Sequence, residues 1–266
     1  MPPDELITSA VNPTIKRIRS LLRRKGRTRE RAFVLEGWRA LADALDAGIV
    51  PLLIVLREDV SSVRLPALPP KVVVRRLATM IFDNLAQTQH PQGVLAVVPI
   101  PDIPPAQGGV PLTLVVDGVR DPGNLGTLLR SAAAAGVDQV LLTPETVDPF
   151  NPKAVRAGMG AQLRVAISFV DADELGAIMR ERHIVALADA GGEVPYDAVS
   201  WGRAAALIVG GEAFGPSSIG MEVATVRIRV PLHAGMESLN AGVAGSVVLF
   251  EAARQRRLAA EVSTGP

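Results

Sequence analysis

The chain has 266 residues, of which 48% are apolar, so one large or two medium-sized domains with a sizeable core are expected. The absence of cysteine excludes disulfide bonds, cysteine-bound zinc and a thiol nucleophile. The net charge of +1 conceals a basic first segment, because residues 1–40 hold ten Lys or Arg against four Asp or Glu. Such a segment favours a polyanionic partner such as nucleic acid, although a solvated basic helix has the same composition.

Two further features of the composition narrow the class of protein. Aromatic residues make up only 3% of the chain, which argues against a platform that stacks single-stranded bases. No apolar run approaches the ~20 residues that span a bilayer, and no apolar signal core is found near the N-terminus. We therefore expect a soluble cytoplasmic protein without a membrane partner.

Residues 1–98 predict a small α/β domain. Asn12 and Pro13 form a helix start, with Ile15 and Ile18 on one face of the helix and Gly26 expected to end it. Further helices are expected over residues 38–47 and 77–85, and strands over residues 32–35, 52–56, 72–74 and 94–98.

Residues 99–111 contain five prolines and two glycines, which is typical of an extended and fairly stiff linker. The second domain, residues 112–266, alternates apolar runs with helical segments. Continuous apolar runs of this kind predict a parallel sheet covered on both faces, with ligands at the carboxyl ends of the strands. The six expected strands are residues 112–116, 139–142, 163–167, 183–188, 205–209 and 226–230.

Three loops follow these strands and carry candidate site residues. In the first, residues 117–126, Asn124 is expected to cap a helix that presents Arg130 away from its apolar face; a surface arginine in an ion pair is the alternative. In the second, residues 210–217, Pro216 stands where a phosphate-binding loop has lysine. With Glu212 as its only charge, this loop suits a neutral or cationic ligand, unless it is a plain glycine turn.

The third loop, residues 232–240, leads into a helix whose first half is crowded with Gly242, Gly245 and other small residues. Each interior glycine costs on the order of 1 kcal/mol relative to alanine. Such a cost is understandable if another backbone or a ligand comes very close, and a tightly packed core helix is the simplest interpretation.

Taken together, these loops resemble the three motifs of the SpoU (TrmH-like) branch of the SPOUT methyltransferases. The resemblance rests on the order Asn124…Arg130, then Gly210-x-Glu212-x-x-Gly215, then Val230-Pro231-Leu232…Ser238-Leu239-Asn240. It implies transfer of a methyl group from S-adenosylmethionine to a ribose 2′-hydroxyl of rRNA or tRNA, and for this chain we expect 23S rRNA as the substrate. It also implies a trefoil knot in the C-terminal domain, an L30e-like substrate-binding N-terminal domain, and a homodimer with no DNA partner.

The resemblance further implies roles for individual residues. Gly210, Val230 and Leu239 match the family's cofactor contacts, and Arg130 matches its catalytic arginine. Supporting roles in the site fall to Asn124, Glu212, Ser238 and Asn240. No metal is implied, since the three histidines, His90, His183 and His233, lack ligand spacing.

Several positions depart from the family pattern. Glycine stands at 158 and 211 where serine and a small polar residue or alanine are usual, and Ala241-Gly242 stands where Val-Ser is usual. The altered third motif leaves open a catalytically weak RNA-binding member of the family. A tRNA 2′-O-methyltransferase and a nucleotide-binding regulator that uses the glycine loop are two further alternatives.

Overall fold

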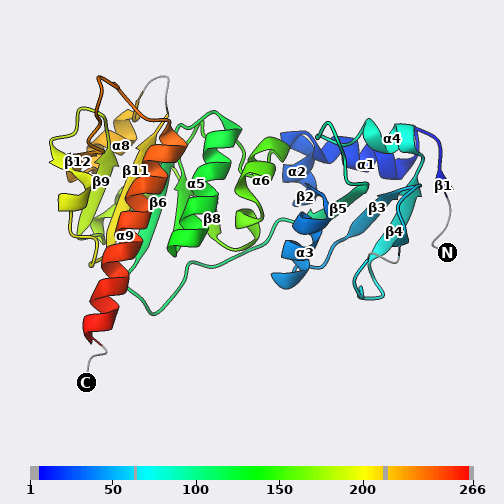
Figure 1. Ribbon diagram of the computed structural model, residues 1–266, viewed down its shortest axis with the longest axis horizontal. Coiled ribbons are helices and arrows are strands. Elements are labelled where there is room, and N and C mark those ends of the chain that lie inside the picture. Colours follow the sequence, from blue (N-terminus) through cyan, green and yellow to red (C-terminus); the bar gives the residue numbers. More distant parts are fainter. Residues whose placement is uncertain (1–5, 63–64, 212–214, 264–266) are drawn as a thin grey trace. The chain divides into compact units, whose positions relative to one another are not determined.

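The computed structural model describes residues 6–62, 65–211 and 215–263 (Figure 1). The chain divides into two compact units. One comprises Met1–Asp102 with Phe150–Arg156, and the other comprises Ile103–Pro149 with Ala157–Pro266. Within the described ranges, no helix has both the length and the apolar character needed to cross a membrane.

The first unit is built on a mixed five-stranded sheet. Its strands run in the order β1 (Leu6–Ile7), β4 (Val73–Leu77), β3 (Leu53–Arg57), β5 (Val94–Pro99), β2 (Ala32–Glu36). The first three strands are mutually parallel, and β5 pairs antiparallel with both β3 and β2. The helices of this unit are α1 (Pro13–Leu21), α2 (Arg24–Glu30), α3 (Trp38–Asp46) and α4 (Thr79–Asp83).

The start of α1 is as predicted, but two expectations for this unit are wrong. Asn12 Oδ1 accepts a hydrogen bond from Thr14 N at 2.9 Å. Gly26 does not end α1; it lies inside α2, where an added Cβ would come within 2.0 Å of the Ser20 carbonyl oxygen. The helix expected over residues 77–85 is confined to α4, because Leu77 is the last residue of β4 and pairs with β1 and β3.

The second unit contains a seven-stranded sheet in which every pairing is parallel. Its strands run in the order β10 (Val194–Pro195), β12 (Val226–Arg229), β9 (Ile184–Ala188), β11 (Ala205–Gly210), β6 (Leu112–Asp117), β7 (Gln139–Leu142), β8 (Ala166–Phe169). The parallel sheet predicted from the continuous apolar runs is thereby confirmed.

Two layers of helices cover this sheet. Alternate strand residues such as Leu114 and Leu207 pack with α5 (Pro122–Ala135) and α9 (Ala241–Ser263). Their neighbours Val115 and Ile208 pack on the opposite face with α7 (Ala172–Arg180) and α8 (Ser218–Val223). Short 3₁₀ turns lie at Ala161–Leu163 and Tyr196–Ala198 of this unit, and helix α6 (Pro152–Gly158) begins in the segment that belongs to the first unit. The strand expected over residues 163–167 begins later, because Arg164 N and Val165 N close the first of these turns on the carbonyl oxygen of Ala161.

The glycine-rich half of α9 packs directly against α5, and Figure 1 shows the two helices side by side. A Cβ added at Gly242 would lie 3.1 Å from Thr127 Cβ, and one at Gly245 would lie 2.4 Å from Leu128 Cδ2. The hydroxyls of Ser131 and Ser246 meet at 2.6 Å between the same helices. The small residues of α9 are therefore explained by the close approach of another helix.

Candidate functional site

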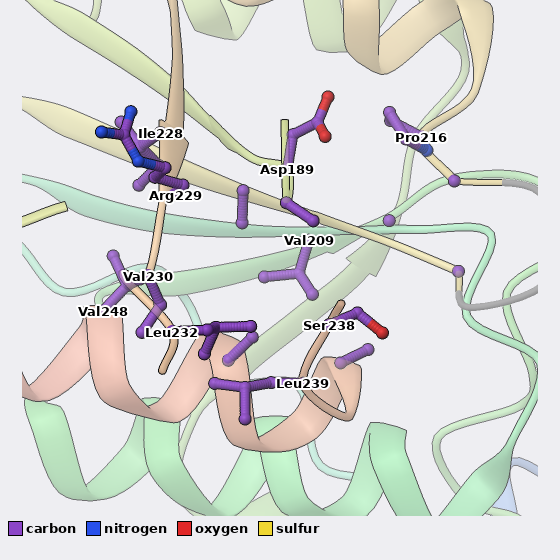
Figure 2. Close-up of a pocket in the computed structure, with 17 residues that line it drawn as sticks. Asp189, Val209, Pro216, Ile228, Arg229, Val230, Leu232, Ser238, Leu239 and Val248 are labelled. Atoms are coloured by element: carbon purple, nitrogen blue, oxygen red, sulfur yellow. The ribbon is translucent and has the colours of Figure 1, made fainter. Parts of the chain in front are cut away.

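A pocket of about 280 Å³ opens at the carboxyl edge of β9, β11 and β12 (Figure 2). Asp189 and Ala190 reach it directly after β9, and Gly210 and Gly211 reach it at the end of β11. The segment after β12 contributes Val230, Leu232, Ser238 and Leu239. The site therefore lies where parallel sheets usually bind ligands.

The walls of this pocket are mainly apolar, with two charges on one side. Figure 2 shows Leu232 and Leu239 beside α9, which itself carries Val248, and Asp189 and Arg229 on the other side of the pocket. A largely apolar group fits against walls of this kind, while the charged side suits polar substituents.

Neighbouring residues hold both charged side chains in place. Asp189 accepts hydrogen bonds from Arg227 Nε at 3.0 Å and from Gly191 N at 2.9 Å. The hydrogen bond from Arg227 is the largest influence on this carboxyl group and holds the pKa of Asp189 below its usual value. Arg229 Nη1 donates to the carbonyl oxygen of Gly192 at 2.8 Å.

The glycines of the second loop allow the chain to fold tightly beside the pocket. A Cβ added at Gly210 would lie 2.7 Å from Pro216 N, and one at Gly211 would lie 2.6 Å from the Gly118 carbonyl oxygen. Gly211 and Gly215 also face each other in an isolated β-bridge. With this backbone, any side chain at position 211 would collide with the first loop, which explains the glycine there.

The first loop lies beside a second hollow of about 320 Å³. Asp121 and the ion-paired side chains of Arg120 and Glu145 contribute to its lining. Gly211, Gly215 and Pro216 line both the hollow and the pocket. The two cavities are thus neighbours at one edge of the sheet.

Two of the sequence-predicted site residues meet although they are far apart in the chain. Asn240 Nδ2 donates a hydrogen bond to Asn124 Oδ1 at 2.8 Å, and Asn240 Oδ1 accepts one from Val243 N at the start of α9. The prediction that Asn124 caps α5 is wrong. The cap is Asp121, whose Oδ1 accepts from Asn124 N at 2.9 Å, because Pro122 takes the first helical position.

Arg130 is presented as the sequence predicts. It is exposed on α5, while Leu125, Leu128 and Leu129 on the same helix are buried. Arg130 forms no hydrogen bond or ion pair within the described ranges of the chain, so the alternative of an ion-paired surface arginine finds no support there.

The remaining predicted residues divide into two groups. Gly210, Val230, Ser238 and Leu239 all line the pocket. Glu212 lies outside the described residues. Sequence reasoning missed Asp189 and Arg229; the signal for Asp189 was its place directly after the apolar run 183–188.

Comparison with known proteins decides the family. Residues 111–250 match the SpoU rRNA Methylase family, and residues 12–96 match the MRM3-like substrate binding domain. The chain belongs to the SpoU rRNA methylase family. The resemblance noted in the sequence is confirmed, and so is an α/β fold with a parallel-sheet domain preceded by a smaller substrate-binding domain.

Individual relatives are similar over most of the chain. The 23S rRNA (guanosine(2553)-2′-O)-methyltransferase RlmP of Bacillus subtilis is 33% identical, with 92% of this chain and 97% of the relative covered. Mouse mitochondrial rRNA methyltransferase 3 is 31% identical over 88% of this chain and 70% of its own. The structure of an AdoMet-bound rRNA methyltransferase from Sinorhizobium meliloti is 30% identical, with a TM-score of 0.79 and coverage of 95% and 98%.

Proposed function

We propose that this SpoU family member transfers a methyl group from S-adenosylmethionine to a ribose 2′-hydroxyl of 23S rRNA. The pocket carries this proposal, because Gly210, Val230 and Leu239, the three positions that match the family's cofactor contacts, converge on it from separate segments. The names of the relatives support the reaction, since RlmP methylates a guanosine 2′-hydroxyl of 23S rRNA. AdoMet bound to the similar Sinorhizobium protein supports the methyl donor.

The residues of the pocket suit this methyl donor. Val209, Leu232, Leu239 and Val248 offer apolar walls for the adenine ring, and Gly210 and Gly211 line the pocket without side chains of their own. Asp189 and Arg229 provide opposite charges for a molecule that carries both an amino and a carboxylate group. When bound, S-adenosylmethionine supplies an electrophilic sulfonium methyl group.

The remaining site residues are proposed to prepare the RNA. A guanidinium group stays protonated in proteins, so Arg130 is assigned to grip the phosphate beside the target ribose and to stabilise the developing alkoxide. The hydrogen bond between Asn124 and Asn240 connects the first loop to the third and fixes their relative positions. Ser238 and Glu212 are proposed to help orient the ribose. Positioning of this kind can lower a barrier by ~7–11 kcal/mol.

The first unit is proposed to deliver the RNA. Residues 1–98 act as the substrate-binding domain, residues 99–111 as a linker and residues 112–266 as the methyltransferase domain. Lys16, Arg19, Arg23 and Lys25 are exposed on and between α1 and α2, where they can contact phosphates. A cytoplasmic location is part of the same proposal.

We also propose a homodimer and a trefoil knot in the second unit. Val243 and Phe250 on α9 are 46% and 52% exposed although both are apolar, which favours a covered face. A knot is a rare exception among protein folds, and the proposal rests on membership of the SpoU family.

Isothermal titration tests the proposed function. A methyltransferase binds S-adenosylmethionine, whereas a pure RNA-binding member binds only RNA and a nucleotide-binding regulator prefers ATP or GTP. Failure to bind S-adenosylmethionine at millimolar concentration would refute the proposal. Transfer to tRNA in place of 23S rRNA would correct the substrate and leave the reaction intact.

A further inference from the structure

Asp117 is a buried acidic residue at the carboxyl end of β6, and its carboxyl group has only neutral partners in the described part of the chain. It is 1% exposed. Its Oδ2 accepts a hydrogen bond from Ser217 N at 2.7 Å, and its Oδ1 accepts one from the Thr143 hydroxyl at 2.8 Å. Burial of a carboxyl group without a cation is costly. A carboxyl group buried at this cost is expected to make contacts that an apolar side chain cannot make.

The hydrogen-bond partners of Asp117 show that it joins the two ends of the glycine loop. The second loop leaves β11 at Gly210–Gly211 and returns at residues 215–217, just before α8. Gly211 N donates to the Asp117 carbonyl oxygen at 3.0 Å, while Ser217 N donates to the Asp117 carboxyl group. One residue therefore holds both ends of the glycine loop. Gly211 at the first anchor, together with Gly215 and Pro216 just before the second, lines the proposed donor pocket.

We propose that Asp117 is a positioning residue for the methyl donor. It fixes the spacing between the two ends of the glycine loop and so preorganises one wall of the pocket. Of the residues that the structure describes, neither Asp117 nor Ser217 lines this pocket, so the effect acts through the backbone. A wall that is ordered before binding costs less to order on binding, which raises affinity without a new contact. This inference rests on the proposed function, since it concerns the affinity for S-adenosylmethionine.

Thr143 provides a matched control within the same network. Its hydroxyl donates to Asp117 and accepts a hydrogen bond from Gly118 N at 3.1 Å. It is buried like Asp117, but it bonds to neither end of the glycine loop. Thr143→Val therefore removes a buried hydrogen bond to the same carboxyl group while the Ser217 anchor stays in place.

Two substitutions at Ser217 test the donor of the same hydrogen bond. Its backbone N–H is the anchor, whereas its side-chain hydroxyl accepts from Gly220 N at 3.3 Å and caps α8. Ser217→Ala removes the cap and keeps the anchor. Ser217→Pro removes both, and the φ of −71° at this position suits proline.

The test measures S-adenosylmethionine affinity by titration calorimetry, RNA affinity and melting temperature for the full-length variants. Asp117→Ala and Ser217→Pro are expected to weaken S-adenosylmethionine binding by about tenfold or more and to leave RNA affinity unchanged. Thr143→Val and Ser217→Ala should stay within about threefold of wild type. Asp117→Asn should also stay close to wild type. Its amide oxygen can accept from Ser217 N and its NH₂ can donate to Thr143, whose hydroxyl then turns to the Pro144 carbonyl oxygen at 3.4 Å.

Two results would overturn the assignment. One is wild-type S-adenosylmethionine affinity in Ser217→Pro. This variant tests the assignment by itself if Asp117→Ala does not fold. The other is an equal loss of affinity in Thr143→Val and Asp117→Ala, which would make the network merely structural. Both are distinct from failure of the proposed function, in which the wild-type protein itself would not bind S-adenosylmethionine.

Discussion

Replacement of Gly245 by alanine tests the close contact between α9 and α5. Alanine is favoured over glycine in a helix interior by about 1 kcal/mol. At this position, however, the new Cβ would lie 2.4 Å from Leu128 Cδ2 and 3.0 Å from Val209 Cγ2. Both neighbours are buried in the core, so neither can move into solvent. Overpacking of this kind costs about 1–3 kcal/mol, so the propensity gain is outweighed or at best cancelled.

Gly176 in α7 is the matched control, because it belongs to the same unit and its added Cβ would meet only Arg180 Nη1 at 3.8 Å. Gly176→Ala should therefore raise the melting temperature by about 2–4 °C, whereas Gly245→Ala should lower it by up to about 8 °C. Calorimetry of the two variants measures both effects in the same unfolding transition. Equal stabilisation by both substitutions would refute the view that α9 needs glycine to approach α5.

Three other predictions concern catalysis, RNA binding and assembly. Arg130→Ala should fold and bind S-adenosylmethionine normally but transfer methyl groups about 10²-fold more slowly, a loss of ~2.7 kcal/mol of transition-state stabilisation. Arg130→Lys should be nearly as slow if the planar guanidinium grips a phosphate through two hydrogen bonds. A wild-type rate in Arg130→Ala would remove Arg130 from the mechanism. Joint replacement of Lys16, Arg23 and Lys25 by Gln should weaken RNA binding and flatten its salt dependence, and an unchanged salt slope would place the RNA surface elsewhere. Phe250→Glu should convert a dimer into a monomer in light scattering, and a monomeric wild-type protein at micromolar concentration would contradict the assembly.

Long apolar runs made most of the second unit predictable from the sequence. The run at 139–142 coincides with β7, and the runs at 112–116 and 205–209 each fall one residue short of the strand. Periodicity could not find β1 or β10, because each contains only two residues and owes its existence to pairing with β4 or β12. Tertiary pairing, which local patterns do not encode, decided those elements.

The site was predictable in its location and less so in its detail. The rule that ligands bind at carboxyl ends of parallel strands led to the loops that line the pocket. The cap at Asp121 could have been found, since Asp121-Pro122 repeats the pattern that was recognised at Asn12-Pro13. The bond between Ser217 and Asp117 spans 100 positions in the sequence, and no local pattern predicts it.

Methyl transfer to unmodified 23S rRNA tests the central claim most directly. Purified protein is incubated with this RNA and methyl-labelled S-adenosylmethionine, and the product is hydrolysed in alkali. Alkaline cleavage of RNA needs a free 2′-hydroxyl, so a methyl group on the ribose protects the adjacent phosphodiester. We predict label in alkali-resistant dinucleotides, with little in the Arg130→Ala variant. Label confined to bases, or no transfer to RNA by a protein that binds S-adenosylmethionine, would contradict the assignment.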